Sequence, residues 1–577
     1  MLELGRIESL GEALRDAVLT YKSNAALFEV DRHREQLTLS YHELRAEAER
    51  VAAALQAEGF EPGDRVAILM SNQARWVVSS MAGLWAGAVL IPLDYKLTAK
   101  EQLALLAHAK PRVLITEDHI HRELSEIGEP GLEHVRVLVT GARGDGPLAG
   151  AERFDDIKGG RFVLKRRQRE DLASIVYSSG TGGTPKGCML THDNYLEQAQ
   201  VLGRMFPMEE GDRYFSILPT NHAIDFMCGT VVPFLFGASV VHQRTLRAEF
   251  IAPTMKRYKV THTAVVPRIL RSLKEGIDER LDELPSWQRS TIDALMDINE
   301  LATMQRPRPG LSRKLLKPIH DGFGGRLKTV FAGGAFVEPE LAEYFYKLGI
   351  PIVIGYGLTE ACTVLTVNDL QPFRGTTVGK PVAGVELELR DIGDDGVGEV
   401  YARGRTIMRG YLDAEELTAE TLVDGWLRTG DLGQVDAAGH LRLRGRARNM
   451  IVTEGGKNIY PEDIEGAFEG VDCEELGVFA SDFIWPRSGL SGERLTLVIR
   501  PRKKQAAGPM LAEVAAANRQ LADFKRVSSY VVWEEEFPRT ASMKLKRAEL
   551  AAQVRERVNA ATPFEEAPTL KRAVGEG

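Results

Sequence analysis

The first hundred residues alternate between helical and strand patterns of apolar positions. Ser40 and Glu43 form a capping-box pattern, and the apolar residues that follow recur on one face of a helix. Apolar runs over 65–70 and 89–93 predict strands on either side of a helix over 73–86. This alternation predicts a parallel sheet that is covered by helices.

The same alternation resumes after residue 171, where three predicted strands lead into glycine-rich turns. The strands cover 172–177, 327–332 and 350–354. In doubly wound sheets, ligands bind outside the carboxyl ends of the strands. We therefore expect a binding site where the three turns meet.

The length of 577 residues exceeds what one hydrophobic core supports, so we expect at least two domains. The predicted fold class is α/β, with a large N-terminal domain of doubly wound sheets plus a small β region over 1–445. A hinge over 446–449 then leads to a small, mobile α+β C-terminal domain over 450–560. Residues 561–577 are predicted to form a polar tail.

Net charge, cysteine content and the length of the apolar runs further restrict the partners and the compartment that we expect. A net charge of −8 argues against nucleic acid as the main partner. Four scattered cysteines without metal-ligand spacing predict a reducing compartment, and we expect a cytoplasmic protein. The longest apolar run, 226–241, is too short to span a bilayer, so we expect no transmembrane segment and at most peripheral membrane contact.

A segment of small and hydroxyl residues follows the strand over 172–177. Such residues let backbone N–H groups close on phosphate oxygens, and Lys186 adds a mobile positive charge. Pro185 and Gly187 flank this lysine, which excludes a Walker A loop. The alternative is a flexible surface loop. The candidate phosphate-binding residues are Ser178, Ser179, Gly180, Thr181, Gly182, Gly183, Thr184 and Lys186.

Four other polar or aromatic residues stand at predicted strand ends or turns. Glu360 suits a Mg²⁺ ligand, Tyr356 suits stacking on a base, and Asp431 suits two ribose hydroxyls. Each also fits a structural role, as a helix N-terminal carboxylate, a core residue and an Asx-turn, respectively. His222 is likewise compatible with a structural role.

Taken together and in order, these motifs resemble those of the adenylate-forming acyl-activating enzymes. This superfamily comprises acyl-CoA synthetases, firefly-type luciferases and peptide-synthetase adenylation domains. The resemblance covers about residues 25–555, in the segments SSGTGGTPKG, PTNH, AGGA, GYGLTE, RTGD, GRARN, GGKNIYPEDIE and PRTASMK. It implies that a carboxylate attacks ATP to give acyl-AMP and pyrophosphate, and that a thiol, usually of CoA, then releases AMP.

The resemblance also assigns roles to individual residues. Lys186 and a Mg²⁺ ion at Glu360 would hold the β- and γ-phosphates, Thr359 an α-phosphate oxygen, and Lys544 the attacking carboxylate. His222 corresponds to a residue between the acyl pocket and the reaction centre. The implied nucleotide-binding residues are Gly333, Gly334, Ala335, Gly355, Tyr356 and Gly357 around adenine, with Asp431 and Arg446 at the ribose.

For the second step, the resemblance implies a rotation of the C-terminal domain at the hinge residue Arg448. That rotation would withdraw Lys544 and bring Gly455, Gly456 and Lys457 toward a thiol channel. Two positions depart from the family pattern: Gly182 replaces a usual Thr, and Met543 replaces a usual Gly just before the catalytic Lys. The order of the motif favours Lys544 over Lys546 as that lysine.

The segments 273–320 and 326–335 look most like the fatty-acyl branch. The apolar run 226–241 is a candidate wall of an acyl tunnel, with Gly229 and Gly237 making room; the alternative is an ordinary core segment. We therefore predict a medium- or long-chain fatty acid–CoA ligase that uses ATP, Mg²⁺ and CoA. The alternatives are transfer to an acyl carrier protein, a non-catalytic acyl-ligand sensor and, less favoured, a luciferase-like oxygenase or a kinase.

Overall fold

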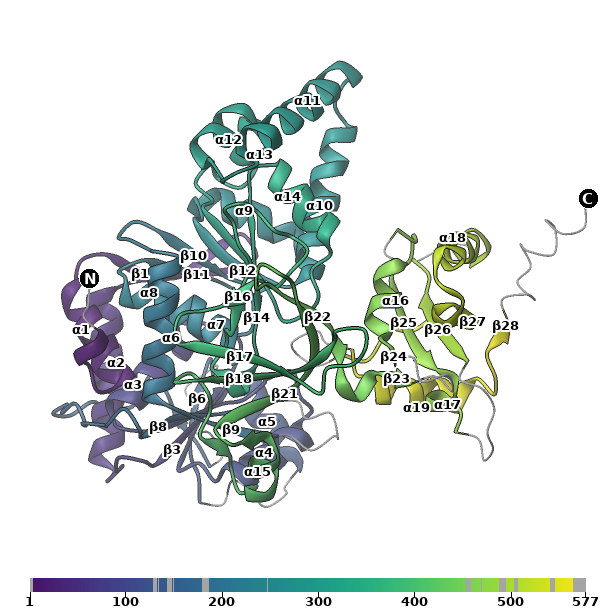
Figure 1. Cartoon of the computed structure of the whole chain (residues 1–577). Coiled ribbons are helices and arrows are strands. Elements are labelled where there is room, and N and C mark those ends of the chain that lie inside the picture. Colours follow the sequence, from purple (N-terminus) through teal and green to yellow (C-terminus); the bar gives the residue numbers. More distant parts are fainter. Residues whose placement is uncertain are drawn as a thin grey trace, which may run out of the picture. The chain divides into compact units, whose positions relative to one another are not determined.

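Figure 1 shows the computed structural model of the whole chain. The structure describes residues 4–127, 132, 134–142, 148, 150–178, 186–245, 247–452, 458–468, 470–486, 494–502, 507–539 and 545–563. It forms two compact units, Met1–Leu387 with Ala402–Arg428, and Glu388–Tyr401 with Thr429–Gly577. The domain boundary at residue 445 stays a prediction.

Two mainly parallel sheets form the first unit. One has eight strands, in the order β19 (Gly410–Tyr411), β9 (Lys186–Thr191), β8 (Leu172–Ser178), β4 (Val89–Pro92), β3 (Arg65–Leu69), β5 (Val113–Glu117), β6 (Arg136–Thr140) and β7 (Glu152–Arg153). The other has nine, in the order β16 (Lys380–Pro381), β15 (Thr366–Val367), β14 (Ile352–Tyr356), β13 (Thr329–Ala332), β12 (His262–Val265), β10 (Arg213–Ser216), β11 (Ser239–Gln243), β1 (Ala25–Asp31) and β2 (Arg34–Ser40).

Helices cover these sheets as the apolar periodicity predicts. The capping box of Ser40 and Glu43 is confirmed at the start of α2, and Thr191 caps α6. The helices of this unit are α1 (Leu10–Thr20), α2 (Tyr41–Ala57), α3 (Ala74–Trp85), α4 (Ala99–Ala109), α5 (Asp118–Ile127), α6 (His192–Met205), α7 (Ala223–Phe226), α8 (Val232–Leu235), α9 (Ala248–Tyr258), α10 (Pro267–Asp282), α11 (Ser286–Thr303), α12 (Pro309–Leu315), α13 (Lys317–Gly322), α14 (Pro339–Lys347) and α15 (Glu415–Thr421).

The carboxyl ends of the two sheets are tied together by one buried amide. Asn72, just beyond β3, donates from Nδ2 to the carbonyl oxygen of Leu218 at 2.6 Å. Its Oδ1 accepts the backbone N–H of Thr220 at 2.9 Å. Because Leu218 and Thr220 follow β10, the strand ends of both sheets meet at this point.

The helices α10 to α14 form a lobe at the top of Figure 1, with α11 at its outer end. The inner faces of α9, α10 and α14 pack on the nine-stranded sheet through residues such as Met255, Leu270 and Phe345. No helix in the described ranges is long and apolar enough to cross a membrane.

The predicted helix after the candidate phosphate loop is preceded by a strand that the sequence reading missed. β9 runs antiparallel to β8, so the loop connects the two strands of a hairpin. The residues of β9 alternate only partly between buried and half-buried positions. The sequence of β9 therefore lacks the clear period of two that identifies a strand.

The second unit contains a four-stranded sheet in the order β25 (Glu475–Ala480), β26 (Leu495–Arg500), β27 (Val527–Val532) and β28 (Thr562–Pro563). Its helices are α16 (Pro461–Ala467), α17 (Ser481–Ile484), α18 (Ala507–Gln520) and α19 (Arg547–Arg557). The helix start at Pro461 is confirmed. β28 lies within the segment that was predicted as a polar tail.

The small β region forms a separate five-stranded sheet. Its strands are β17 (Val385–Arg390), β18 (Gly398–Gly404), β20 (Leu422–Val423), β21 (Trp426–Val435) and β22 (Leu441–Arg446). β21 and β22 pair antiparallel, and this pairing positions the RTGD motif opposite the GRARN motif.

Candidate active site

The β8–β9 hairpin positions both ends of the candidate phosphate loop. Ser178 and Lys186 are directly opposite each other in the last pair of the ladder. The predicted loop residues between them, Ser179 to Thr184, lie outside the described residues. Ser178 and Lys186 therefore mark where the loop leaves the sheet and where it returns.

Glu360 is the acidic centre of this part of the site. Its Oε1 accepts a hydrogen bond from the hydroxyl of Tyr411 at 2.9 Å and a longer one from Ser178 Oγ at 3.4 Å. The ammonium of Lys186 lies 5.4 Å from the centre of the Tyr411 ring. The structure thus brings together three predicted residues, Ser178, Lys186 and Glu360. Tyr411, which the sequence did not predict, lies among them.

The residue that the sequence reading missed is Tyr411. It lies on β19, directly opposite Cys188 of β9, in a segment recognised only as a short strand. Burial, followed by the neighbouring Glu360 charge, raises the pKa of Tyr411 well above its usual value. Its hydroxyl is therefore protonated at neutral pH and serves as the donor to the carboxylate.

Close backbone packing joins the other predicted turns. A Cβ on Gly333 would lie 3.1 Å from the carbonyl oxygen of Gly355, so the ends of β13 and β14 nearly touch. A Cβ on Gly357 would collide with the backbone of Thr363. Gly334 adopts a φ of +80°, which favours glycine. The turn predicted to hold adenine thus requires glycine for steric reasons.

The PTNH segment leads into a helix that lies next to these two glycine-rich turns. His222 is half-buried at the start of α7, and Thr363 Oγ1 donates to the carbonyl oxygen of Ala223 at 3.2 Å. The side chain of Ile224 approaches Gly334, since a Cβ there would lie 3.9 Å from its Cδ1. The start of α7, which follows His222, thus lies beside both glycine-rich turns. Tyr356, the residue predicted to stack on a base, is only 7% exposed.

A buried carboxyl group lies one turn beyond His222. Asp225 is fully buried, and its Oδ2 accepts hydrogen bonds from Ser216 at 2.7 Å and from Thr220 at 3.1 Å. Burial raises the pKa of Asp225 to about 7, although the two hydroxyl donors oppose that shift. Sequence reading missed Asp225, because an acidic residue inside an apolar run carries no motif of its own.

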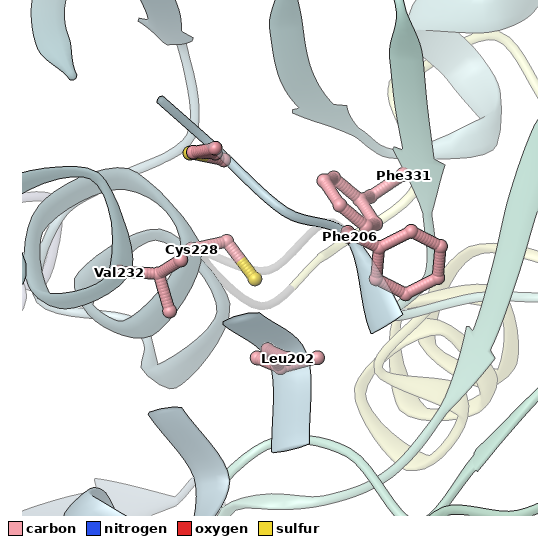
Figure 2. Close-up of a pocket in the computed structure, with 6 residues that line it drawn as sticks. Leu202, Phe206, Cys228, Val232 and Phe331 are labelled. Atoms are coloured by element: carbon pink, nitrogen blue, oxygen red, sulfur yellow. The ribbon is translucent and has the colours of Figure 1, made fainter. Parts of the chain in front are cut away.

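A small apolar cavity lies next to the same helix (Figure 2). Its volume of about 10 Å³ is roughly the space that one water molecule needs. The rings of Phe206 and Phe331 meet edge to face, with centroids 4.9 Å apart. The lining residues are Leu202, Phe206, Met208, Cys228, Val232 and Phe331.

The expectation that Gly229 and Gly237 make room for an acyl chain is wrong. A Cβ on Gly229 would meet Asp225 and Tyr214, and one on Gly237 would meet the ring of Tyr21. Both glycines make room for side chains of the protein itself. The run 226–241 is buried throughout and contributes Cys228 and Val232 to the cavity.

The second unit holds the other predicted nucleotide-binding residues. Asp431 and Arg446 are directly opposite each other on β21 and β22, and Arg446 Nε lies 2.7 Å from Asp431 Oδ1. Arg446 also donates to the carbonyl oxygen of Thr429 at 3.2 Å. Asp431 is only 6% exposed, so this pair holds its carboxylate in one orientation. The predicted hinge residue Arg448 is exposed on the next turn.

Lys544, Gly455, Gly456 and Lys457 lie outside the described residues, but the flanks of Lys544 are anchored. Arg539 forms an antiparallel bridge with Leu545. Glu475 Oε1 accepts from Arg539 Nε at 2.9 Å, and its Oε2 accepts from Arg500 Nε at 2.8 Å. A buried carboxylate between two guanidinium groups thus fixes the residue where the PRTASMK segment begins.

A family model described as AMP-binding enzyme matches residues 14–412, which is more than half of the chain. The chain therefore belongs to the AMP-binding enzyme family. Its relatives are acid–CoA ligases, and it is an adenylate-forming ligase of this AMP-forming type.

Two relatives illustrate the range of acids. A 3-[(3aS,4S,7aS)-7a-methyl-1,5-dioxo-octahydro-1H-inden-4-yl]propanoyl:CoA ligase of Rhodococcus jostii (strain RHA1) is 30% identical over 535 residues, covering 88% of this chain and 92% of the relative. The long-chain-fatty-acid–CoA ligase FadD15 of Mycobacterium bovis (strain ATCC BAA-935 / AF2122/97) is 28% identical over 430 residues, covering 72% of this chain and 70% of the relative.

Solved structures confirm the predicted α/β fold. The anthranilate CoA ligase AuaEII in complex with anthranoyl-AMP has a TM-score of 0.79 at 22% identity, covering 97% of this chain and 100% of that one. The o-succinylbenzoate CoA synthetase MenE of Bacillus subtilis, in complex with ATP and magnesium, has a TM-score of 0.72 at 24% identity, covering 93% and 98%.

Asp225→Asn should make stability less dependent on pH. The pKa of Asp225 is about 7 in the folded protein and about 3.9 in an unfolded chain. Between these values the folded state binds the extra proton, so wild-type stability falls as pH rises toward 7. The melting temperature of Asp225→Asn relative to wild type should therefore increase from pH 5 to pH 8.

Glu152→Gln is the matched control for this comparison. The hydrogen bond from Arg136 lowers the pKa of Glu152, so the residue is ionised in both states throughout that range. Its melting temperature relative to wild type should be the same at pH 5 and pH 8. An equally constant difference for Asp225→Asn would contradict the assigned titration.

Proposed function

We propose that this protein activates an apolar carboxylic acid with ATP and transfers the acyl group to coenzyme A. The observation that carries the proposal is the group formed by Ser178, Lys186 and Glu360 at the end of the β8–β9 hairpin. A cation and a hydroxyl beside a loop suited to phosphate, with a carboxylate opposite, are the parts that a nucleoside triphosphate and its metal require.

In the first step, a carboxylate oxygen of the acid attacks the α-phosphorus of ATP, and pyrophosphate leaves. Both reactants are anions, so their repulsion must be screened. Lys186 supplies a positive charge beside the loop, and Lys544 is the proposed cation at the attacking carboxylate. Preorganised charges of this kind contribute roughly 10²–10³ in rate each.

Glu360 is the proposed Mg²⁺ ligand, and its surroundings fit that role. Tyr411 and Ser178 both donate to Oε1, which orients the carboxylate. Among the described residues no three His, Cys, Asp or Glu side chains form a metal site. Mg²⁺ bound to nucleotides commonly takes one or two carboxylates, phosphate oxygens and water, and there it neutralises phosphate charge.

The proposed nucleotide contacts follow the resemblance of the motifs. Gly333, Gly334, Ala335 and the 355–357 turn would face adenine, Thr359 an α-phosphate oxygen, and Asp431 the ribose hydroxyls. The pairing of Arg446 with Asp431 supports the ribose assignment, because it holds the carboxylate in one orientation.

In the second step, the thiol of CoA attacks the acyl carbonyl of acyl-AMP, and AMP leaves. Rotation at Arg448 would exchange Lys544 for Gly455, Gly456 and Lys457 at the reacting carbonyl. Transfer to a carrier protein remains the alternative acceptor. A non-catalytic sensor is disfavoured because Glu360, Asp431 and Lys544 are all present.

The proposed acid is a medium- or long-chain fatty acid. The likeness to FadD15 supports an apolar acyl group. A second candidate is a compact ring-bearing acid. The likeness to the Rhodococcus jostii ligase favours it.

A panel of acids tests the substrate class. The protein should release AMP with ATP, Mg²⁺ and fatty acids of graded length, and form the thioester only when CoA is present. A preference for bicyclic propanoates over every fatty acid would favour the second candidate. Acyl-AMP without thioester would favour a carrier protein, and no AMP with any acid would contradict the proposal.

Tyr411→Phe should weaken the Mg²⁺ dependence of adenylation. Loss of the hydroxyl frees Glu360 to rotate, and loss of such a supporting hydrogen bond costs about 10–100-fold in metal affinity or activity. The Mg²⁺ concentration for half-maximal ATP–pyrophosphate exchange should therefore rise by about tenfold.

Tyr344→Phe is the control, because Tyr344 donates to a different carboxylate, Asp278, at 2.7 Å in the helical lobe. It should leave the Mg²⁺ dependence unchanged. Equal Mg²⁺ curves for Tyr411→Phe and wild type would show that Tyr411 does not position Glu360.

Lys544→Ala should separate the two steps. It should slow acyl-AMP formation by roughly 10²–10³, because one preorganised charge is lost. Thioester formation from supplied acyl-AMP should proceed at the wild-type rate, since Lys544 is withdrawn in that step. Lys546→Ala is the control and should retain adenylation; the opposite outcome would assign the role to Lys546.

A further inference from the structure

The PTNH turn, residues 219–222, is fastened to the first unit through one threonine. The backbone N–H of Thr220 donates to Asn72 Oδ1 at 2.9 Å, and the Thr220 hydroxyl donates to Asp225 Oδ2 at 3.1 Å. Thr220 and both of its partners are buried. The turn is therefore held at its backbone by the segment after β3 and at its side chain by α7.

His222 lies between the two residues that make the second of these bonds. Thr220 precedes it by two positions, and Asp225 follows it by three. The backbone N–H of His222 donates to the carbonyl oxygen of Pro219 at 3.0 Å, and its own carbonyl oxygen accepts the N–H of Phe226 at 3.0 Å. The hydrogen bond between Thr220 and Asp225 thus closes a short loop of chain around His222 and limits how far that residue can move.

The carboxyl group of Asp225 uses only one of its two oxygens. Oδ2 accepts hydrogen bonds from Ser216 at 2.7 Å and from Thr220 at 3.1 Å. Oδ1 is buried and has no hydrogen-bond partner in the ranges that the structure describes. Hydrogen bonds to an ionised oxygen are about twice as strong as those between neutral groups. Both hydroxyl groups therefore bind the ionised form of Asp225 more tightly, and they favour that form against the cost of its burial.

Asp225 is the residue of this cluster that changes charge near neutral pH. Burial raises its pKa to about 7, and no charged side chain in the described parts of the chain contributes to that shift. Burial, together with the Asp225 charge, raises the pKa of Cys228 to about 12 and that of Tyr214 well above its usual range. Burial also lowers the pKa of His242, next to Ser216, to about 4. These three neighbours are therefore neutral at pH 7.

We propose that Asp225 is a positioning residue for acyl-AMP formation: its ionised carboxylate holds Thr220 and thereby fixes the turn that carries His222. The role rests on the proposed function and deepens it, because it assigns control of the first step to a residue outside the motifs. Protonation of Asp225 weakens its hydrogen bonds to Thr220 and Ser216. The turn is then held less tightly, so the first step should slow below neutral pH.

The pH dependence of acyl-AMP formation tests this role. The rate at saturating ATP and acid is measured from pH 5 to pH 8 for wild type and for Asp225→Asn, which keeps an acceptor oxygen but carries no charge. In the ratio of the two rates, the titrations of His222 and of ATP cancel. This ratio should rise by about tenfold around pH 7, because two hydrogen bonds become charge-assisted as Asp225 ionises. The KM for ATP should not change.

Thr220→Val identifies the bond that transmits the effect. In a Thr220→Val background, the same ratio should rise by only about threefold, because one of the two hydrogen bonds is gone. Its midpoint should move to higher pH, since the Thr220 hydroxyl lowers the pKa of Asp225. Thr254→Val is the control background, because Thr254 is a buried threonine whose hydroxyl donates to Gln243 Oε1 at 2.9 Å. There the ratio should match that of wild type.

A ratio that stays constant from pH 5 to pH 8 would overturn the role, and so would equal midpoints in the Thr220→Val and Thr254→Val backgrounds. The proposed function is judged by wild type itself. Wild type that forms no acyl-AMP at any pH would contradict the function and this role together. Normal acyl-AMP formation with a constant ratio would contradict the positioning role alone.

Discussion

The orientation of the Glu360 carboxylate is the constraint on which the first half of the site depends. Two hydroxyl groups hold it, one from the end of β8 and one from β19, and β9 lies between these strands in the sheet. A carboxylate on a short turn would otherwise rotate freely. The β8–β9–β19 edge thus sets the direction of Glu360, and the same hairpin carries the loop and Lys186.

In the second unit, guanidinium groups and not hydroxyl groups fix the position of a carboxylate. Glu475 is 7% exposed and receives guanidinium groups from Arg500 and Arg539. Removing a buried carboxylate from between two cations typically costs about 3–5 kcal/mol. The network ties Arg539, near the start of the PRTASMK segment, to the four-stranded sheet. Under the proposed two-step cycle, such an anchor would let the lysine of this segment change position only when the unit moves as a whole.

Much of this arrangement was predictable from the sequence, and the missed residues have identifiable causes. Ser40, Thr191 and Pro461 start helices as expected, since caps are local signals. The glycine-rich turns also lie where the apolar runs end. Tyr411 and Glu475 were missed, because their roles arise from partners distant in the chain, whereas Asp225 was missed because an acidic residue inside an apolar run carries no motif of its own. Tyr411 looks like any strand aromatic until β19 pairs with β9.

The segment after His222 shows how one helix serves two environments. Asp225 points to the hydroxyls of Ser216 and Thr220, whereas Cys228 and Val232 face the apolar cavity. The turn η2 (Met227–Val231) between them is π-helical, and its wider turn rotates the residues that follow. Gly229 packs against Asp225 and Tyr214, on the side of the segment that carries the polar cluster. One continuous helical segment therefore presents a carboxyl group to the hydroxyls near β10 and apolar side chains to the rings of Phe206 and Phe331.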